Sequence, residues 1–383
     1  MDKKTIVFGG LTCLVLAGSL AFRPMTNVSE DVAHLRKMYS SGDTAKWPKP
    51  VLHSSVTNFV DIGPLSSVPY PADNQPNDAK KELGKMLFYD PRLSVSNQIA
   101  CASCHDPQLG WGDGKRIAFG HDRKTGKRNA MTILNTAFYK KLFWDGRANS
   151  LEDQARFPVG DHLEMNLDAN VMAKKVSQFK GYKPLFQKAF GDDKIDLSRI
   201  LKAIATFERT IVSPPSRFDL FVKGNADALK DDEVLGLNLF RTKAGCINCH
   251  NSPLFSDNQF HNDGQTLWGS VNEDLGLYNV TKNKADVGKF KTPSLRETMN
   301  TGPWMHHGNF PTIMDVIHFY NLGNPAVVQK KYMGTSRDSL LPVTSPILKR
   351  LNLNDDERKQ LVAFLQSITT TPRRLNAPTD FPQ

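Results

Sequence analysis

The chain has 383 residues, of which 39% are hydrophobic and 23% are charged, and its formal net charge is +10. This length suits two domains of ordinary size, and the composition is typical of a globular protein. Beyond the N-terminus, no stretch approaches the roughly 20 apolar residues that a membrane-spanning helix needs. The basic residues are spread out and lack any nucleic-acid-binding signature, so we expect no nucleic-acid partner; a basic surface can instead steer an acidic protein partner.

Residues 1–22 have the pattern of an export signal. Lys3 and Lys4 precede an apolar run from Ile6 to Phe22, and Ser19-Leu20-Ala21 offers small residues for cleavage. An uncleaved N-terminal anchor is the alternative, whereas the residues before Cys13 are a poor context for lipidation. In either case we expect the folded part to lie outside the cytoplasm, as a periplasmic or otherwise exported protein, tethered to the membrane if the N-terminus is retained.

Two irregular regions are expected. Residues 23–75 are rich in Pro, Ser, Asn and Asp and show no long apolar period, so we interpret them as a linker and wrapping arm. Residues 106–128 form a charged, glycine-rich loop, which is a length that compact domains seldom keep without a use. We expect this loop to be mobile and functional.

The remaining pattern is helical. Periodicity begins near Ala79 and stops at Asp90-Pro91, because proline disfavours a helical conformation in the preceding residue. Asp196 is expected to cap a helix that carries apolar residues on one face as far as Ile211 and ends at Ser213-Pro214-Pro215, the expected domain boundary. Three more helices are predicted to start near Asp231 and, from capping-box spacings, at Thr312 and Asn354. Alternating strand patterns are scarce, so the fold class is mainly α, with domains at 76–215 and 216–375.

Two segments fit the haem-attachment pattern C-x-x-C-H: Cys101-Ala102-Ser103-Cys104-His105 and Cys246-Ile247-Asn248-Cys249-His250. Two cysteines at this spacing can bond the two vinyl groups of one porphyrin, which directs the adjacent histidine at the iron. A redox-active cysteine pair or a four-cysteine zinc site shares part of the pattern. A zinc site leaves both histidines unexplained, and a disulfide exchanger does not need two motifs. We therefore expect two covalently bound c-type haems.

Three further motifs make the chain resemble the bacterial di-haem cytochrome c peroxidase and MauG superfamily from about Lys80 to Thr370. They are the runs 87–94 (LFYDPRLS), 143–147 (FWDGR) and 291–296 (KTPSLR). The resemblance implies two cytochrome c-like haem domains with long connecting loops. It also implies that the first haem is peroxidatic and that the second receives electrons from outside.

The resemblance assigns roles to three residues around the first haem. Trp144 matches the tryptophan that bridges the haems, although an indole there can also simply fill the core. Glu164 matches the acid on the peroxide side; a carboxyl group in an apolar pocket has a raised pKa and can move a proton between the two peroxide oxygens. Gln154 matches its neutral hydrogen-bonding partner. Without the resemblance, Glu164 and Gln154 have the pattern of surface residues.

Two further sites rest on the same resemblance. His121, inside the glycine-rich loop, matches a removable sixth iron ligand, so that loop movement would switch the first haem between closed and open states. A solvated loop histidine is the alternative. Asn129, Thr301 and Pro303 match residues that bind a calcium ion between the domains through an amide oxygen and backbone carbonyls, which suit a hard cation.

The second haem departs from the peroxidase pattern. Tyr320 stands where typical peroxidases of the family have a methionine ligand, and its surroundings, 319–323 (FYNLG), are MauG-like. A phenolate ligand stabilises ferric iron and lowers the haem potential. Met333 is the alternative ligand, and Tyr320 would then be a core aromatic.

These residues leave three functions open. We favour reduction of hydrogen peroxide by a cytochrome-c peroxidase-type enzyme, fed by a small cytochrome c or copper protein. The alternatives are a MauG-like enzyme that oxidises a specific protein through a high-valent di-haem state, and a non-catalytic electron carrier, which would not need Glu164 or Gln154. The family resemblance also suggests a homodimer.

Overall fold

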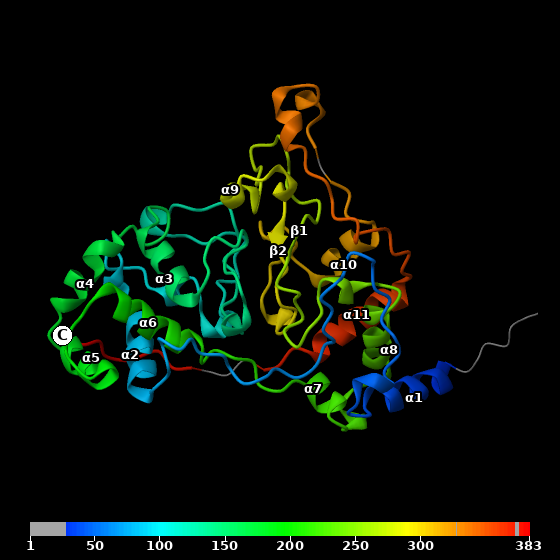
Figure 1. The fold of residues 1–383 in the computed structure, drawn as a ribbon, viewed down its shortest axis with the longest axis horizontal. Coiled ribbons are helices and arrows are strands. Elements are labelled where there is room, and N and C mark those ends of the chain that lie inside the picture. Colours follow the sequence, from blue (N-terminus) through cyan, green and yellow to red (C-terminus); the bar gives the residue numbers. More distant parts are fainter. Residues whose placement is uncertain (1–27, 327, 372–374) are drawn as a thin grey trace, which may run out of the picture.

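A computed structural model describes residues 28–326, 328–371 and 375–383. The predicted export signal at 1–22 lies outside the described residues. The described chain forms two lobes joined by long irregular segments (Figure 1). It contains eleven α-helices and one two-stranded sheet, which confirms the mainly α fold class. None of the helices in these ranges is long and apolar enough to span a membrane.

The first lobe is built from α2 (Asp78–Tyr89), α3 (Leu151–Gly160), α4 (Ala169–Ser177), α5 (Tyr182–Phe190) and α6 (Leu197–Glu208). As predicted, α2 stops before Asp90-Pro91 and Asp196 caps α6. Buried side chains of these helices form one hydrophobic cluster between Leu83 and Ile211. The glycine-rich loop has no α-helix within 106–128; it carries only short 3-10 turns.

The second lobe holds α7 (Arg217–Val222), α8 (Asp231–Arg241), α9 (Tyr278–Thr281), α10 (Ile313–Asn321) and α11 (Asp355–Ser367). Strands β1 (Phe260–His261) and β2 (Phe290–Lys291) pair antiparallel with Phe260 opposite Lys291. The predicted capping boxes at Thr312 and Asn354 are present and begin α10 and α11. A second hydrophobic cluster includes Phe218, Phe240 and Phe364.

In each lobe, a glycine allows two helices to pack closely against each other. In the first, α2 packs on α6 so closely that a Cβ on Gly84 would overlap the carbonyl oxygen of Ala203. In the second, α8 packs on α11, and a Cβ on Gly236 would overlap the carbonyl oxygen of Gln360. Each glycine lies on the helix that precedes a C-x-x-C-H motif. The halves are therefore built alike, as the sequence predicts.

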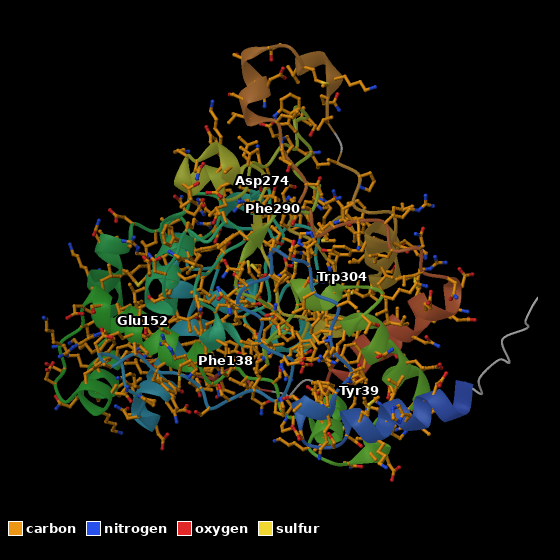
Figure 2. All side chains as sticks on the ribbon, turned by 45° about the vertical axis from the view of Figure 1, so that its right-hand side comes forward. Tyr39, Phe138, Glu152, Asp274, Phe290 and Trp304 are labelled. Atoms are coloured by element: carbon orange, nitrogen blue, oxygen red, sulfur yellow. The ribbon has the colours of Figure 1, made fainter. Side chains whose placement is uncertain are left out.

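The N-terminal arm holds a helix that the sequence pattern does not predict. Helix α1 (Val28–Tyr39) packs on α8 of the second lobe, where the Tyr39 hydroxyl donates to Asn238 at 3.0 Å. The arm then crosses to the first lobe, where the side chain of Asn74 donates to Glu152 at 2.7 Å. Figure 2 places Tyr39 and Glu152 in different lobes. The described part of the arm therefore contacts both lobes and contains a helix.

Two other connections hold the lobes together. The C-terminus returns to the first lobe beside α5, where the amide of Gly181 donates to the carbonyl of Gln383 at 2.6 Å (Figure 1). Between the lobes, Arg128 forms ion pairs of 2.6 Å with both Asp145 and Asp274. Because Asp274 belongs to the second half of the chain, this half-buried cation links the two halves.

Candidate active site

The two C-x-x-C-H motifs have the same local geometry. Each begins with a 3-10 turn, Cys101–Ser103 or Cys246–Asn248, and each histidine amide donates back to the carbonyl of the first cysteine. The Nδ1 of His105 lies 3.1 Å from the carbonyl oxygen of Trp111, and the Nδ1 of His250 lies 3.1 Å from that of Phe255. Because a carbonyl can only accept, Nδ1 must carry the proton and Nε2 is left unprotonated. That is the tautomer an iron ligand needs.

Burial supports this reading of both histidines. Desolvation lowers the pKa of His105 and of His250 below the ordinary value, so both rings stay neutral at physiological pH. The four motif cysteines form no disulfide. Neutral histidines beside two unpaired cysteines fit covalent haem at each motif.

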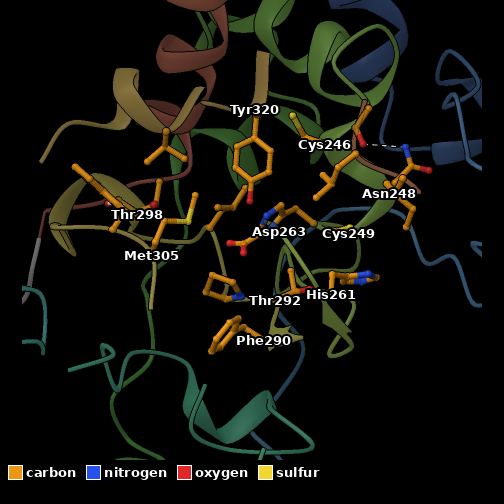
Figure 3. A pocket seen from close by; sticks show the side chains of 18 of the residues that line it. Cys246, Asn248, Cys249, His261, Asp263, Phe290, Thr292, Thr298, Met305 and Tyr320 are labelled. Carbon is orange, nitrogen blue, oxygen red and sulfur yellow. Dashed lines mark hydrogen bonds between the residues drawn. The ribbon is translucent and has the colours of Figure 1, made fainter. Parts of the chain in front are cut away.

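A cavity of about 480 Å³ lies at the second motif and falls within the range of cofactor pockets. Cys246, Cys249 and His250 line it, and so does Tyr320 from α10 (Figure 3). Burial raises the pKa of Tyr320 well above its usual value, and the neighbouring Asp263 adds to the shift. This phenol would ionise only beside a cation such as ferric iron. The structure therefore brings Tyr320, but not Met333, to the second motif.

Met333 lies elsewhere. It follows a 3-10 turn (Lys330–Tyr332), its side chain is 52% exposed, and it does not line the cavity. Met305 and Asp263 are among the cavity residues that were not singled out from the sequence. Desolvation raises the pKa of Asp263 to about 6. Neither residue stands in a recognisable motif, so no sequence signal could have found them.

Glu164 lies in the first lobe, on a tight turn after α3. The turn is held by its amide, which donates to the carbonyl of Asp161 at 3.0 Å, and by the amide of Met165, which donates to Pro158 at 3.1 Å. Burial raises the pKa of Glu164; the Asp161 charge adds to this effect and Arg147 opposes it. Burial raises the pKa of Cys104, and the charges of Asp113 and Glu164 add to this effect, so Glu164 lies near the first motif.

The glycine-rich loop docks on the same turn. The amide of His121 donates to the carbonyl of Glu164 at 2.7 Å, and a Cβ on Gly120 would overlap the carbonyl oxygen of Leu163. The next residues, Asp122 and Arg123, have φ values of 53° and 58°, a region that costs free energy for residues other than glycine. The buried Nδ1 of His121 has no hydrogen-bond partner, while Nε2 lies 3.3 Å from Asp122.

Gln154 is half-buried on α3, the helix that leads into the Glu164 turn. No hydrogen bond joins the side chains of Gln154 and Glu164, both of which the structure describes. The two residues share an element and its following turn, and their direct partnership stays a prediction.

Trp144 belongs to the first half of the chain but lines the cavity of the second motif. Its indole Nε1 donates to the carbonyl of Asn129 at 3.0 Å, and its own carbonyl accepts from the amide of Lys291 at 2.8 Å. The ring meets that of His306 edge to face, with centroids 6.3 Å apart. The side chain is therefore held from both halves of the chain at their junction.

The three expected calcium ligands, Asn129, Thr301 and Pro303, also line this cavity. The Asn129 amide group is oriented with Nδ2 toward the carbonyl of Lys115, at 2.8 Å. The oxygen and nitrogen of an amide are assigned from such contacts and can exchange by rotation. The set offers neutral oxygens, which fit a hard cation without compensating its charge.

Comparison with known proteins gives the same class. A family model described as di-haem cytochrome c peroxidase matches residues 78–227. Cytochrome-c peroxidase IdrP1 of Pseudomonas sp. (strain SCT) is 37% identical over 350 residues, which cover 84% of this chain and 89% of the relative. The methylamine utilization protein MauG of Methylophilus methylotrophus is 36% identical over 316 residues, with 82% and 89% covered. The crystal structure of a MauG-like protein associated with microbial copper homeostasis has a TM-score of 0.69 at 27% identity, with 83% and 96% covered.

The fold and its paired histidine–cysteine sites define a c-type cytochrome with two covalently bound haems. The chain belongs to the di-haem cytochrome c peroxidase family, which includes the MauG proteins. It is a peroxidase-type oxidoreductase.

Proposed function

We propose that this enzyme reduces hydrogen peroxide at the first haem, with electrons that enter through the second haem from a small redox protein. Each peroxide takes up two electrons and two protons and yields two water molecules. The observation that carries this proposal is the carboxyl group of Glu164, partly buried near the first motif, with a pKa raised by burial. A plain electron carrier has no use for such a group.

Glu164 moves the proton. As a carboxylate it takes a proton from one peroxide oxygen and, as the oxygen–oxygen bond breaks, returns it to the leaving oxygen. A raised pKa suits both halves of this transfer because it makes the carboxylate a better proton acceptor and brings its acid and base forms closer in free energy. Once bound, the haem would supply the iron and the electrons, and His105, oriented by the carbonyl of Trp111, would hold it. Gln154 orients peroxide by hydrogen bonding.

Trp144 couples the two sites. The indole is hydrogen-bonded to Asn129 and packs edge to face against His306, while the backbone carbonyl of Trp144 accepts from Lys291. These contacts keep the ring in one orientation, which would keep electronic coupling between the haems constant. His121 controls access: while its loop rests on the Glu164 turn, the imidazole can occupy the peroxide side of the first haem, and loop departure opens that side.

A second function is favoured by Tyr320. Its place in the cavity of the second motif fits a phenolate ligand, which stabilises a more oxidised haem. That property suits a MauG-like enzyme that oxidises side chains of a specific protein. Peroxide reduction is preferred because it needs no dedicated substrate protein.

Calcium at Asn129, Thr301 and Pro303 is part of the same proposal. The carbonyl of Asn129 holds the Trp144 indole, so a cation bound by this residue would stiffen the bridge between the haems. We propose that the protein acts outside the cytoplasm, where c-type haems are attached.

Steady-state kinetics test the proposal. Purified protein is given peroxide and a reduced small cytochrome c, with and without prior reduction of one haem. Robust turnover supports the peroxidase. Slow turnover accompanied by a long-lived oxidised di-haem species supports the MauG-like role instead. Absence of both reactions in a protein with two haems would leave only the electron carrier.

A further inference from the structure

Lys291 is a buried cation with no anionic partner among the described residues. It is 2% exposed, on β2, and its Nζ lies 3.5 Å from the centroid of the Tyr139 ring. No carboxylate in the described ranges comes within 4.0 Å of this ammonium group. Burial alone lowers its pKa to about 7.

The other buried lysine and arginine side chains that the structure describes have oxygen partners. Arg296 binds Asp219 at 2.9 Å, Arg209 binds Glu152 at 2.6 Å, Arg241 binds Asp61, and Lys80 donates to Asn74 at 3.1 Å and to the carbonyl of Gln75 at 2.7 Å. The Tyr139 ring offers Lys291 a cation–π contact, but such a contact replaces only part of the hydration that a buried ammonium group loses. Among the buried lysine and arginine residues that the structure describes, Lys291 alone lacks an oxygen partner, so its charge is left to be compensated by another group.

The location of Lys291 indicates which group compensates its charge. It lines the same cavity as Cys246, Cys249 and His250. Its neighbours in sequence, Phe290 and Thr292, lie across the cavity from Cys246 in Figure 3. The vinyl groups of a c-type haem bond the two cysteines, and its two propionates project from the opposite edge of the porphyrin.

We infer that the Lys291 ammonium group binds a propionate of the second haem and compensates its charge. The chain supplies the cation, the haem supplies the anion, and each removes the cost of burying the other. Asp263 lines the cavity as well, and its carboxylate would repel a propionate. Within this cavity a propionate is therefore expected beside Lys291 and away from Asp263.

This contact would also tie the second haem to the bridge. The backbone amide of Lys291 donates to the carbonyl of Trp144 at 2.8 Å. Lys291 would thus contact a propionate through its side chain and Trp144, whose indole lines the same cavity, through its backbone. Lys291 is a positioning residue, which acts through the haem and does not touch peroxide.

Potentiometric titration of the second haem tests the inference without peroxide, so its outcome is separate from that of the proposed peroxidase activity. Removal of a buried positive charge beside a haem favours the oxidised form. We expect Lys291→Met to retain two haems by mass and to shift the reduction equilibrium of the second haem about tenfold toward the ferric form, which is about 59 mV for one electron. Lys291→Arg keeps the positive charge, so it should bring the reduction equilibrium most of the way back to the wild-type value.

Lys289→Met is the matched control. Lys289 is two residues away on the same segment, is more exposed, and pairs with Asp286 at 3.1 Å. Its loss should leave the potential unchanged. The inference is overturned if Lys291→Met folds with both haems and keeps the wild-type potential, or if Lys289→Met shifts it equally.

Unaltered protein gives a second test in case the Lys291 variants do not fold. The infrared difference spectrum between the ferric and ferrous second haem is recorded with and without ¹⁵N-labelled lysine. A propionate bound by Lys291 should produce a lysine ammonium band that moves with haem oxidation state and with the label. A spectrum insensitive to labelling would refute the contact.

Discussion

The backbone amide of His121 donates a 2.7 Å hydrogen bond to the carbonyl of Glu164. One contact therefore joins the residue expected to close the first haem to the residue expected to move its protons. Because the bond uses backbone atoms, it fixes the loop without occupying the carboxyl group. Departure of the loop would expose Glu164 at the same moment as it removes His121, so access and catalysis would be switched together.

Gly120→Ala tests this docking. A Cβ at position 120 would overlap the carbonyl oxygen of Leu163, so the loop should be displaced from the Glu164 turn. If His121 is the removable ligand, the resting ferric spectrum of the first haem should change from low-spin to high-spin. Peroxide should then react without prior reduction of the second haem.

Gly126→Ala is the control for the loop. Gly126 lies in the same segment, but a Cβ there would meet no atom within 4 Å. This variant should keep the wild-type spectrum and its need for reduction. If both variants behave alike, or if Gly120→Ala leaves the spectrum unchanged, His121 is a solvated loop residue.

Glu164→Gln should keep both haems but lower peroxide turnover by about two to four orders of magnitude, the usual reach of general acid–base catalysis. The amide keeps the size of the side chain and cannot transfer the proton. His162→Gln, on the same turn with a side chain 74% exposed, should remain active. Near-normal turnover of Glu164→Gln would assign proton transfer to another group.

The pH profile should show the same carboxyl group. Burial raises the pKa of Glu164, and the resting enzyme needs the ionised form to accept a proton from peroxide. The value of kcat/KM should therefore fall as pH drops through this raised pKa and level off above it. In Glu164→Gln that acid limb should disappear from the residual activity.

Local signals in the sequence account for much of the fold. The capping boxes at Thr312 and Asn354 set their helix starts through contacts within three residues, so they could be predicted without the rest of the chain. Helix α1 could not, because its stability comes from distant partners: Arg36 binds Asp231 at 2.6 Å and Tyr39 binds Asn238.

In the candidate site, too, some residues could be predicted from local sequence and others could not. Haem attachment is predictable because five consecutive residues carry it. The roles of Lys291 and Asp263 instead depend on the cavity that they line. Its walls come from segments over two hundred residues apart, such as those of His53 and Leu351. Periodicity and motif spacing contain no information about which distant side chains such a cavity gathers.

Ionisation of Glu208 should make the free energy of unfolding depend on pH. This carboxyl group at the end of α6 is 4% exposed, its Oε2 has no hydrogen-bond partner, and burial raises its pKa to about 8. Since this carboxyl group ionises near pH 4.3 in the unfolded chain, its contribution to stability should be most favourable below that pH, fall between about pH 4.5 and 8, and stay low above pH 8. The loss should be roughly 2–5 kcal/mol.

Glu208→Gln removes this loss because the amide cannot ionise. Chemical denaturation at pH 5 and pH 8 should show a variant that gains stability over wild type mainly at pH 8. Glu82→Gln, an exposed position on α2, should track wild type at both pH values. Equal effects of Glu208→Gln at the two pH values would mean that Glu208 is ionised and paired in the folded protein.

Tyr320 decides between the two branches of the family. If its phenolate ligates the second haem, Tyr320→Met should raise the potential of that haem, because thioether sulfur favours ferrous iron whereas anionic oxygen favours ferric iron. The weak far-red band of a sulfur-to-iron bond should appear, while peroxide access at the first haem stays unchanged. Met333→Leu is the control: Met333 is 52% exposed and lies outside the cavity, so its loss should alter neither haem. The opposite pattern, a silent Tyr320→Met and a lowered potential in Met333→Leu, would make Met333 the ligand and would require the segment around Lys330–Tyr332 to move into the cavity when the haem is bound.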